Sequence, residues 1–192
     1  MSGAHAAEDI YVGVGLGKAK GDESLGSLDQ KMAAAAIDAS AYNLSANRSA
    51  YSLYVGKPVN GWLGAEIAYT DLGDVDVELR GDAASVDAFF DQLKDIHVLT
   101  ADGFSLRLVA RRSLMNRVDY YGRLGFFLWQ ADYTLNGNGA HIDIEDSGVD
   151  VEWAIGVSYQ FHPQWSGRLE WGHYELDDAV SITTANVQYH FH

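Results

Sequence analysis

VEWAIGVSYQF, residues 151–161, alternates large apolar side chains with small or polar ones at every position. Val151, Trp153 and Ile155 begin one face, and Glu152 and Ala154 begin the other. A repeat of two residues is the period of a β-strand that has one apolar face. The stretch therefore predicts a strand of about eleven residues.

The same alternation recurs along most of the chain. In the first such segment Ile10, Val12, Val14 and Leu16 share a face, while glycines occupy most of the other. Such regular spacing of segments predicts an all-β fold with about eight antiparallel strands. The other segments with this pattern are 9–19, 49–57, 62–70, 104–111, 120–128, 166–176 and 185–191.

The connections between these segments alternate in length. Three are long, at 20–48, 73–101 and 133–147, and the three between them are short turns at 58–61, 114–117 and 162–164. Transmembrane β-barrels of bacteria have short periplasmic turns and long extracellular loops. The order therefore predicts an up-and-down transmembrane barrel whose N-terminus lies in the periplasm. The tight last connection at Asp177-Asp178 is the exception.

Composition narrows the alternatives. No stretch approaches the roughly 18 apolar residues that a membrane helix needs, whereas a barrel needs only alternation. The absence of cysteine excludes a disulfide framework and a thiolate metal site. The net charge of −14 argues against nucleic acid as a partner.

Alternation alone does not say which face meets lipid. A soluble lipocalin-like barrel would turn its apolar faces inward, and this alternative stays open. The other face carries glycine together with charged residues, which suits a narrow interior where charges pair with one another. We therefore expect apolar faces outside and aromatic girdles near the strand ends, formed by Tyr120, Trp153, Tyr159, Phe161, Trp171, Tyr189 and Phe191.

Five stretches together resemble the membrane domain of the OmpA-type outer-membrane barrels. The resemblance implies a Gram-negative outer-membrane location and a last strand, ending at Phe191, that the barrel-assembly machinery reads. His192 departs from that ending. The stretches are IYVGVGLG (10–17), GAEIAY (64–69), YGRLG (121–125), SGRLEW (166–171) and VQYHF (187–191).

We expect two segments in the chain. Ala4-His5-Ala6 followed by Ala7-Glu8-Asp9 is typical of a signal-peptide cleavage site, so residues 1–8 are interpreted as a leader remnant, although an ordinary flexible leader remains an alternative. Residues 9–192 form the barrel domain. Since the chain ends at the last strand, no cell-wall-binding domain is expected.

The resemblance also implies a charge cluster inside the barrel, where an inward Glu of the third strand pairs with basic residues as a gate. Glu66, Arg107, Arg123 and Glu170 lie at similar distances from the short turns and on the inward parity, so we expect them to meet. Arg168 and Arg111 lie nearer the periplasmic end. Gly15 and Ser158 stand where the family has an inward Lys and Glu. The cluster either fills a narrow interior or regulates conduction.

The sequence offers little support for catalysis. No histidine pair has metal-ligand spacing, and no metal or other cofactor is expected. Barrel-shaped lipases use Ser and His, but Ser166 lies roughly 23 Å along the strand from His173. Ser181 on the neighbouring strand could approach His173 without further motif support, so we expect no enzyme.

Acidic residues gather in the third and fourth connections. Their carboxylates could take divalent cations that bridge lipopolysaccharide phosphates, although a solvated charged surface explains them equally well. A short helix is expected in the second connection, where Val86, Phe89, Phe90 and Leu93 follow Ser85 at helical spacing. The acidic residues are Asp143, Glu145, Asp146, Glu175, Asp177 and Asp178.

These observations favour an outer-membrane structural or anchoring barrel. Its lumen is expected to be narrow and mostly closed, and to admit only small solutes. Outer-membrane lipid and lipopolysaccharide are its expected partners, and a monomer is the expected state. The alternative is an adhesion or partner-binding barrel that acts through its long extracellular loops.

Overall fold

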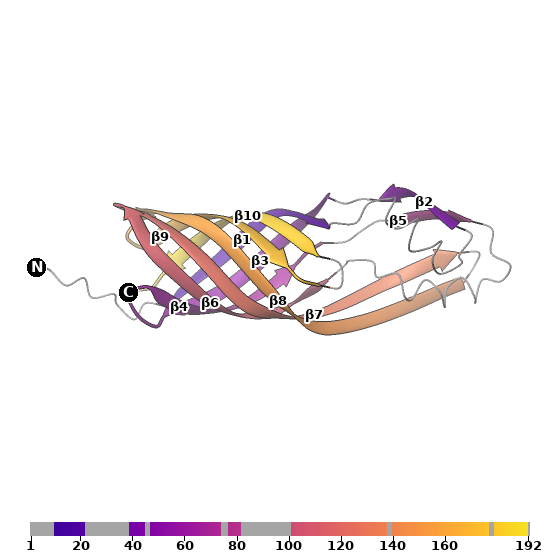
Figure 1. The fold of residues 1–192 in the computed structure, drawn as a ribbon, viewed down its shortest axis with the longest axis horizontal. Helices are drawn as coiled ribbons and strands as arrows, with labels where there is room; N and C mark the ends of the chain where they lie inside the picture. The colour runs from indigo at the N-terminus through magenta and orange to yellow at the C-terminus, as the bar shows by residue number, and fades with distance from the viewer. Residues whose placement is uncertain are drawn as a thin grey trace, which may run out of the picture.

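The computed structural model describes residues 10–21, 39–44, 47–73, 77–81, 101–137, 140–176 and 179–191. Eight strands of these ranges close into an antiparallel barrel, in the order β1-β10-β9-β8-β7-β6-β4-β3 (Figure 1). The expected barrel of about eight strands is therefore confirmed. The strands are β1 Tyr11–Gly21, β3 Asn47–Pro58, β4 Leu63–Asp71, β6 Asp102–Met115, β7 Val118–Gly137, β8 Ala140–His162, β9 Trp165–Tyr174 and β10 Val180–His190.

The barrel closes between its first and last strands. Val14 of β1 lies opposite Val187 of β10 on one side and Leu53 of β3 on the other. Because every barrel strand has two neighbours, no edge remains unpaired within the closed part. The start of β1 and the end of β10 lie at the same end of the barrel as the short turns, on the left of Figure 1.

Large apolar side chains cover the outside of the barrel. Leu16 is 71% exposed, Leu169 62% and Phe104 61%, because these residues occupy the outward parity of their strands. A contiguous exposed apolar band of this kind is typical of a surface that contacts lipid. The expected outward orientation of the apolar faces is therefore observed.

Aromatic rings gather at both ends of this band. Near the short turns, the ring of Tyr189 packs edge-on against Trp165 at 5.0 Å and against Phe191 at 4.9 Å. Near the other end, Tyr69 packs against Phe104 at 5.3 Å. These rings lie where the girdles at the membrane boundaries are expected.

The third connection differs from the expected long loop. Residues of β7 and β8 stay paired from Gln130↔Ser147 to Gly137↔Ala140, so most of 133–147 is a β-hairpin that extends beyond the barrel (Figure 1). The reason lies in the sequence, because Tyr133, Leu135, Ile142 and Ile144 continue the strand alternation on either side of a Gly-rich segment.

The other two long connections contain a small separate sheet. β2 (Ala39–Leu44) and β5 (Val77–Gly81) pair with each other beyond the end of the barrel from which the β7–β8 hairpin extends (Figure 1). The expected helix at 85–93, the leader at 1–8 and the acidic pair Asp177-Asp178 lie outside the described residues. In the part that is described, no helix is long and apolar enough to cross a membrane.

Candidate functional site

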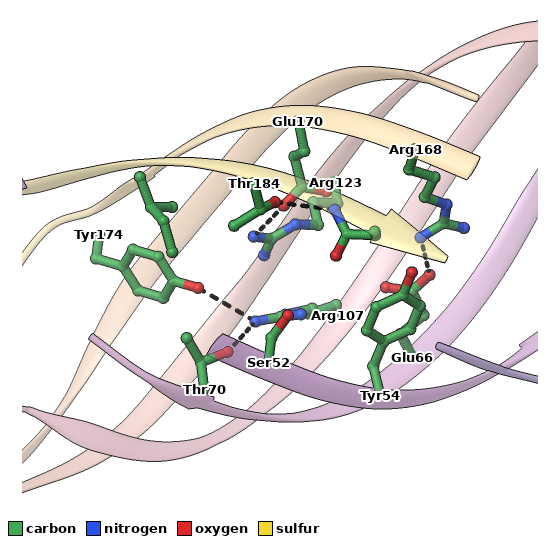
Figure 2. Close-up of a pocket in the computed structure, with 12 residues that line it drawn as sticks. Ser52, Tyr54, Glu66, Thr70, Arg107, Arg123, Arg168, Glu170, Tyr174 and Thr184 are labelled. Atoms are coloured by element: carbon green, nitrogen blue, oxygen red, sulfur yellow. Dashed lines mark hydrogen bonds and ion pairs between the residues drawn. The ribbon is translucent and has the colours of Figure 1, made fainter. Parts of the chain in front are cut away.

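Six charged side chains meet in the described interior of the barrel. They divide into two groups of ion pairs, one in the middle of the barrel and one nearer the short turns. Figure 2 shows the Arg168–Glu66 pair of the second group together with Arg107, Arg123 and Glu170 of the first. All but Glu170, which is partly buried, are nearly inaccessible to solvent. The six residues, called the charged belt below, are Glu66, Arg107, Arg123, Glu152, Arg168 and Glu170.

The middle group is a chain of alternating charges. The carboxylate of Glu152 accepts from Nε of Arg107 at 2.5 Å, and its second oxygen lies 2.9 Å from Nη1 of Arg123. Arg123 also donates from Nη2 to Glu170 at 2.8 Å. Glu152 therefore bonds to two guanidinium groups at once, and Glu170 supplies the second negative charge that balances them.

Arg107 is held by neutral groups as well as by charge. Its Nη2 donates to the hydroxyls of Thr70 at 3.0 Å, Ser105 at 3.2 Å and Tyr174 at 3.3 Å. Figure 2 shows the guanidinium between Thr70 and Tyr174. Because Nε and Nη2 are bonded in this way, the buried guanidinium is held in one orientation.

The second group is built around Arg168. Its Nη1 donates to Oε1 of Glu66 at 2.7 Å, and the hydroxyl of Tyr11 donates to the same oxygen at 2.8 Å. The guanidinium lies over three aromatic rings, with its central carbon 5.4 Å from the ring centres of Tyr11 and Tyr54 and 4.7 Å from that of Tyr121. Arg168 thus combines an ion pair with cation–π contacts.

Each acid of the charged belt accepts a hydrogen bond from a side chain two strands away, and a glycine stands between them on the intervening strand. Arg107 lies opposite Gly125 on the next strand, and Gly125 lies opposite Glu152 on the strand after it. A Cβ atom at Gly125 would lie 3.0 Å from Cγ of Arg107, so the missing side chain leaves the path for the guanidinium. Two other triplets repeat this register: Tyr11, Gly56 and Glu66, and Tyr121, Gly156 and Glu170.

The end of the interior away from the short turns is mainly apolar, with the buried Arg48 opposite Ala19. Phe127 packs edge-on against Tyr174 at 5.0 Å, and both are almost completely buried. This apolar cap therefore lies beyond the charged belt, and the hydroxyl of Tyr174 joins the two. Its buried residues are Ala19, Ala50, Leu72, Ala101, Phe127, Tyr174, Leu176, Val180 and Ile182.

Little open space remains around the charged belt. The pocket there leaves about 10 Å³ for the centre of a water molecule, near the minimum for one water. The hydroxyl of Tyr54, which lines this pocket, has no protein hydrogen-bond partner. The site therefore has the size and polarity for bound water rather than for an organic ligand.

The sequence hypothesis locates most of these residues. Glu66, Arg107, Arg123, Arg168 and Glu170 are all inside the barrel, but Glu66 pairs with Arg168 and not with the middle group. Arg111 is only half-buried.

The interpretation that Ser158 replaces an inward acid is wrong, because the sixth barrel strand, β8, supplies Glu152. Glu152 has the inward parity in the sequence. Its distance from the short turn at 162–164, however, does not predict that it meets the other charged residues. At Gly15, Oδ1 of Asn186 and Oγ of Ser52 occupy the space that a side chain would need.

The structure brings His173 and Ser181 together. Nδ1 of His173 lies 3.2 Å from Oγ of Ser181, on the outer surface of β9 and β10. An activated serine also needs an orienting group and donors for the oxyanion, and in the described chain no acid bonds to this histidine. Nor do the described residues contain a group of three or more metal-binding side chains.

Comparisons with known sequences agree with the fold. The family profile described as OmpA-like transmembrane domain matches residues 5–191. Outer membrane protein A of Shigella flexneri is 29% identical over 141 residues, or 72% of this chain and 36% of that protein. Outer membrane protein A of Salmonella typhi is 28% identical over the same shares. The matched segment thus spans about a third of these relatives.

Solved structures show the same architecture at low identity. The N-terminal barrel domain of Pseudomonas aeruginosa OprF has a TM-score of 0.55 at 9% identity, covering 96% of this chain and 98% of that one. Neisserial surface protein A has a TM-score of 0.58 at 14% identity, with 95% and 97% covered. Ail of Yersinia pestis has 0.52 at 18%, with the same coverage. At these identities the likeness concerns the fold alone.

Proposed function

The chain belongs to the family of OmpA-like transmembrane domains and lies in the Gram-negative outer membrane, and from this premise we propose that it is a structural, anchoring barrel with a closed lumen. One observation carries the proposal: the interior is filled from the tyrosines around Arg168, through the ion pairs of Glu152, to the apolar cap at Phe127. A lumen filled in this way blocks steady diffusion of solutes.

Conduction would require the charged belt to rearrange. Removing one partner from a buried ion pair leaves an uncompensated charge, which costs several kcal/mol. Openings of the intact barrel are therefore expected to be rare and small. This is the sense in which we propose a narrow, mostly closed pore as a secondary property.

Single-channel recording tests the proposal. The purified barrel and the variant Glu66→Ala are reconstituted in planar bilayers, with Glu175→Ala, an exposed position outside the lumen, as the control. We expect wild type and control to stay closed for most of the recording, and Glu66→Ala to open more often because Arg168 has lost its counter-ion. A steady conductance of the wild type would overturn the closed lumen.

The C-terminal strand supports a further part of this proposal. The backbone N–H of Phe191 donates to the carbonyl of Ile10 at 2.9 Å, and its ring packs against Tyr189 on the outer surface. We propose that the barrel-assembly machinery reads this ending. Phe191→Ala should then lower assembly in cells while refolding into detergent is unchanged. Equal assembly in cells would contradict it.

The extended hairpin favours a second candidate function. Between Ala131 and Asp146 the ends of β7 and β8 pair only with each other among the described strands, and an edge that no described strand covers is the kind of surface that pairs with another molecule. The fold is shared with Ail, described as an attachment invasion locus protein, and this likeness supports the second candidate. The second candidate is therefore adhesion through the extracellular end of the barrel.

Adhesion is tested by shortening the hairpin. Residues 131–146 are replaced by a two-residue turn, and cells that display either form are counted on cultured epithelial monolayers. If the hairpin mediates adhesion, fewer cells with the shortened form should attach than cells with the intact form. Equal numbers of attached cells would overturn this second candidate function. Lipid and lipopolysaccharide remain the proposed partners in the membrane itself.

A further inference from the structure

Two exposed lysines stand on the outer surface of β1, at the end of the barrel away from the short turns. Lys18 and Lys20 have the outward parity, and the next outward residue toward the middle of the strand is the apolar Leu16. Leu16 lies opposite Tyr51 of β3, whose ring is 6.2 Å from that of Tyr69. The lysines therefore lie just beyond the aromatic boundary of the apolar band, at the depth of lipid headgroups.

Hydroxyl groups surround these two cations. In the strand register Lys18 lies opposite Thr183 of β10 and Ser49 of β3, and Lys20 lies opposite Ser181 of β10. Nζ of Lys18 donates to Oγ of Ser49 at 3.0 Å. Across the next pair of strands, His173 bonds to Ser181. We call these six residues the rim patch: Lys18, Lys20, Ser49, His173, Ser181 and Thr183.

The charge of the rim patch contrasts with the rest of the protein. The chain carries a net charge of −14, yet in the described segments neither lysine forms an ion pair with a carboxylate. The other described outward cations, such as Lys57 and Arg112, lie near the short turns. On the long-connection side, outward acids are found at Asp71 and Asp102 of β4 and β6, and at Glu175, which borders the patch.

We infer that the rim patch binds the phosphate groups of an outer-leaflet lipopolysaccharide molecule. Two ammonium groups supply charge, and the hydroxyls of Ser49, Ser181 and Thr183 supply hydrogen bonds to phosphate oxygens. Below them Leu16 and Trp171, both on the outer surface, offer an apolar wall to the acyl chains. The inference rests on the proposed membrane function, and it locates a lipid contact on one side of the barrel.

The test compares two lipids that differ only in phosphate. The folded barrel in zwitterionic detergent is titrated with diphosphorylated lipid A and with its dephosphorylated form, and the bound lipid is counted by native mass spectrometry. We expect the double variant Lys18→Gln/Lys20→Gln to bind diphosphorylated lipid A about thirtyfold more weakly, since each lysine near an anionic surface contributes roughly fivefold. Lys57→Gln, an outward cation at the opposite end, is the matched control and should change nothing.

Several outcomes overturn the inference. These are equal affinity of wild type for the two lipids, equal affinity of wild type and the double variant, and an equal loss in Lys57→Gln. Folding of each variant is checked by the mobility of unheated samples in gels. The charge-conserving variant Lys18→Arg/Lys20→Arg is measured as well and should retain binding; it replaces the glutamine variant if that one misfolds. A chain that fails to insert into bilayers would overturn the proposed function, whereas an inserted chain without phosphate preference overturns only the rim patch.

Discussion

Arg107 and Glu152 form an ion pair across an intervening strand, and Gly125 on that strand leaves the space through which they meet. Arg107 has a nearer acid in the register, because Glu66 lies directly opposite it on β4. That acid is instead engaged by Arg168 and Tyr11. Partner choice in this interior therefore follows the placement of glycine as well as the placement of charge.

Glu152→Gln should be among the most damaging single changes in the barrel. Arg107 and Arg123 would remain in the interior with Glu170 as the one carboxylate still bonded to either of them. Loss of one member of a buried charge pair costs about 3–5 kcal/mol. Urea unfolding in detergent micelles, followed by tryptophan fluorescence, measures the change. The exposed Glu175→Gln is the control and should stay within about 0.5 kcal/mol of wild type.

Two neighbouring tyrosines should respond differently to loss of the hydroxyl. In Tyr11→Phe the buried carboxylate of Glu66 loses a hydrogen bond, so we expect a cost of about 1–3 kcal/mol. Tyr54, like Tyr11, packs against the guanidinium of Arg168, but its buried hydroxyl has no protein hydrogen-bond partner. Tyr54→Phe should therefore leave the stability nearly unchanged. The same unfolding measurement compares them. Equal destabilisation would show that a bound water satisfies Tyr54.

The glycine of each triplet should resist even the smallest substitution. A Cβ at Gly56 would lie 2.3 Å from the ring of Tyr11, which would have to leave its contact with Glu66. We expect Gly56→Ala to cost about 1–3 kcal/mol, as overpacking of a filled core does. Gly61 in a short turn has no atom near its Cβ position, so Gly61→Ala is the control. A stable Gly56→Ala barrel with Tyr11 still bonded would contradict the role assigned to the glycine.

The sequence predicts the barrel well because alternation and lipid exposure are local properties. Inward parity also brings Glu66, Arg123 and Glu170 inside, since parity needs only the strand itself. Which acid pairs with which arginine depends on the stagger between strands and on the glycine between them. Counting from the short turns missed that stagger, and this is why Glu152 was not expected. Polar residues interrupt the alternation in the hairpin of β7 and β8, so the sequence pattern predicts a loop where the strands in fact continue to pair.

The outer surface gives the last prediction, because the cost of a charge facing lipid depends on depth. Leu106 and Leu114 are both outward residues of β6 and are exposed to similar extents, at 59% and 60%. Leu106 lies within the apolar band, whereas Leu114 lies beside the turn. Leu106→Arg should cost about 2–4 kcal/mol in a lipid bilayer and Leu114→Arg about 0–1 kcal/mol. Equilibrium unfolding from phospholipid vesicles measures both. Equal costs at the two positions would place the membrane boundary elsewhere on β6, since exposure to water alone would not distinguish two leucines of the same outward face.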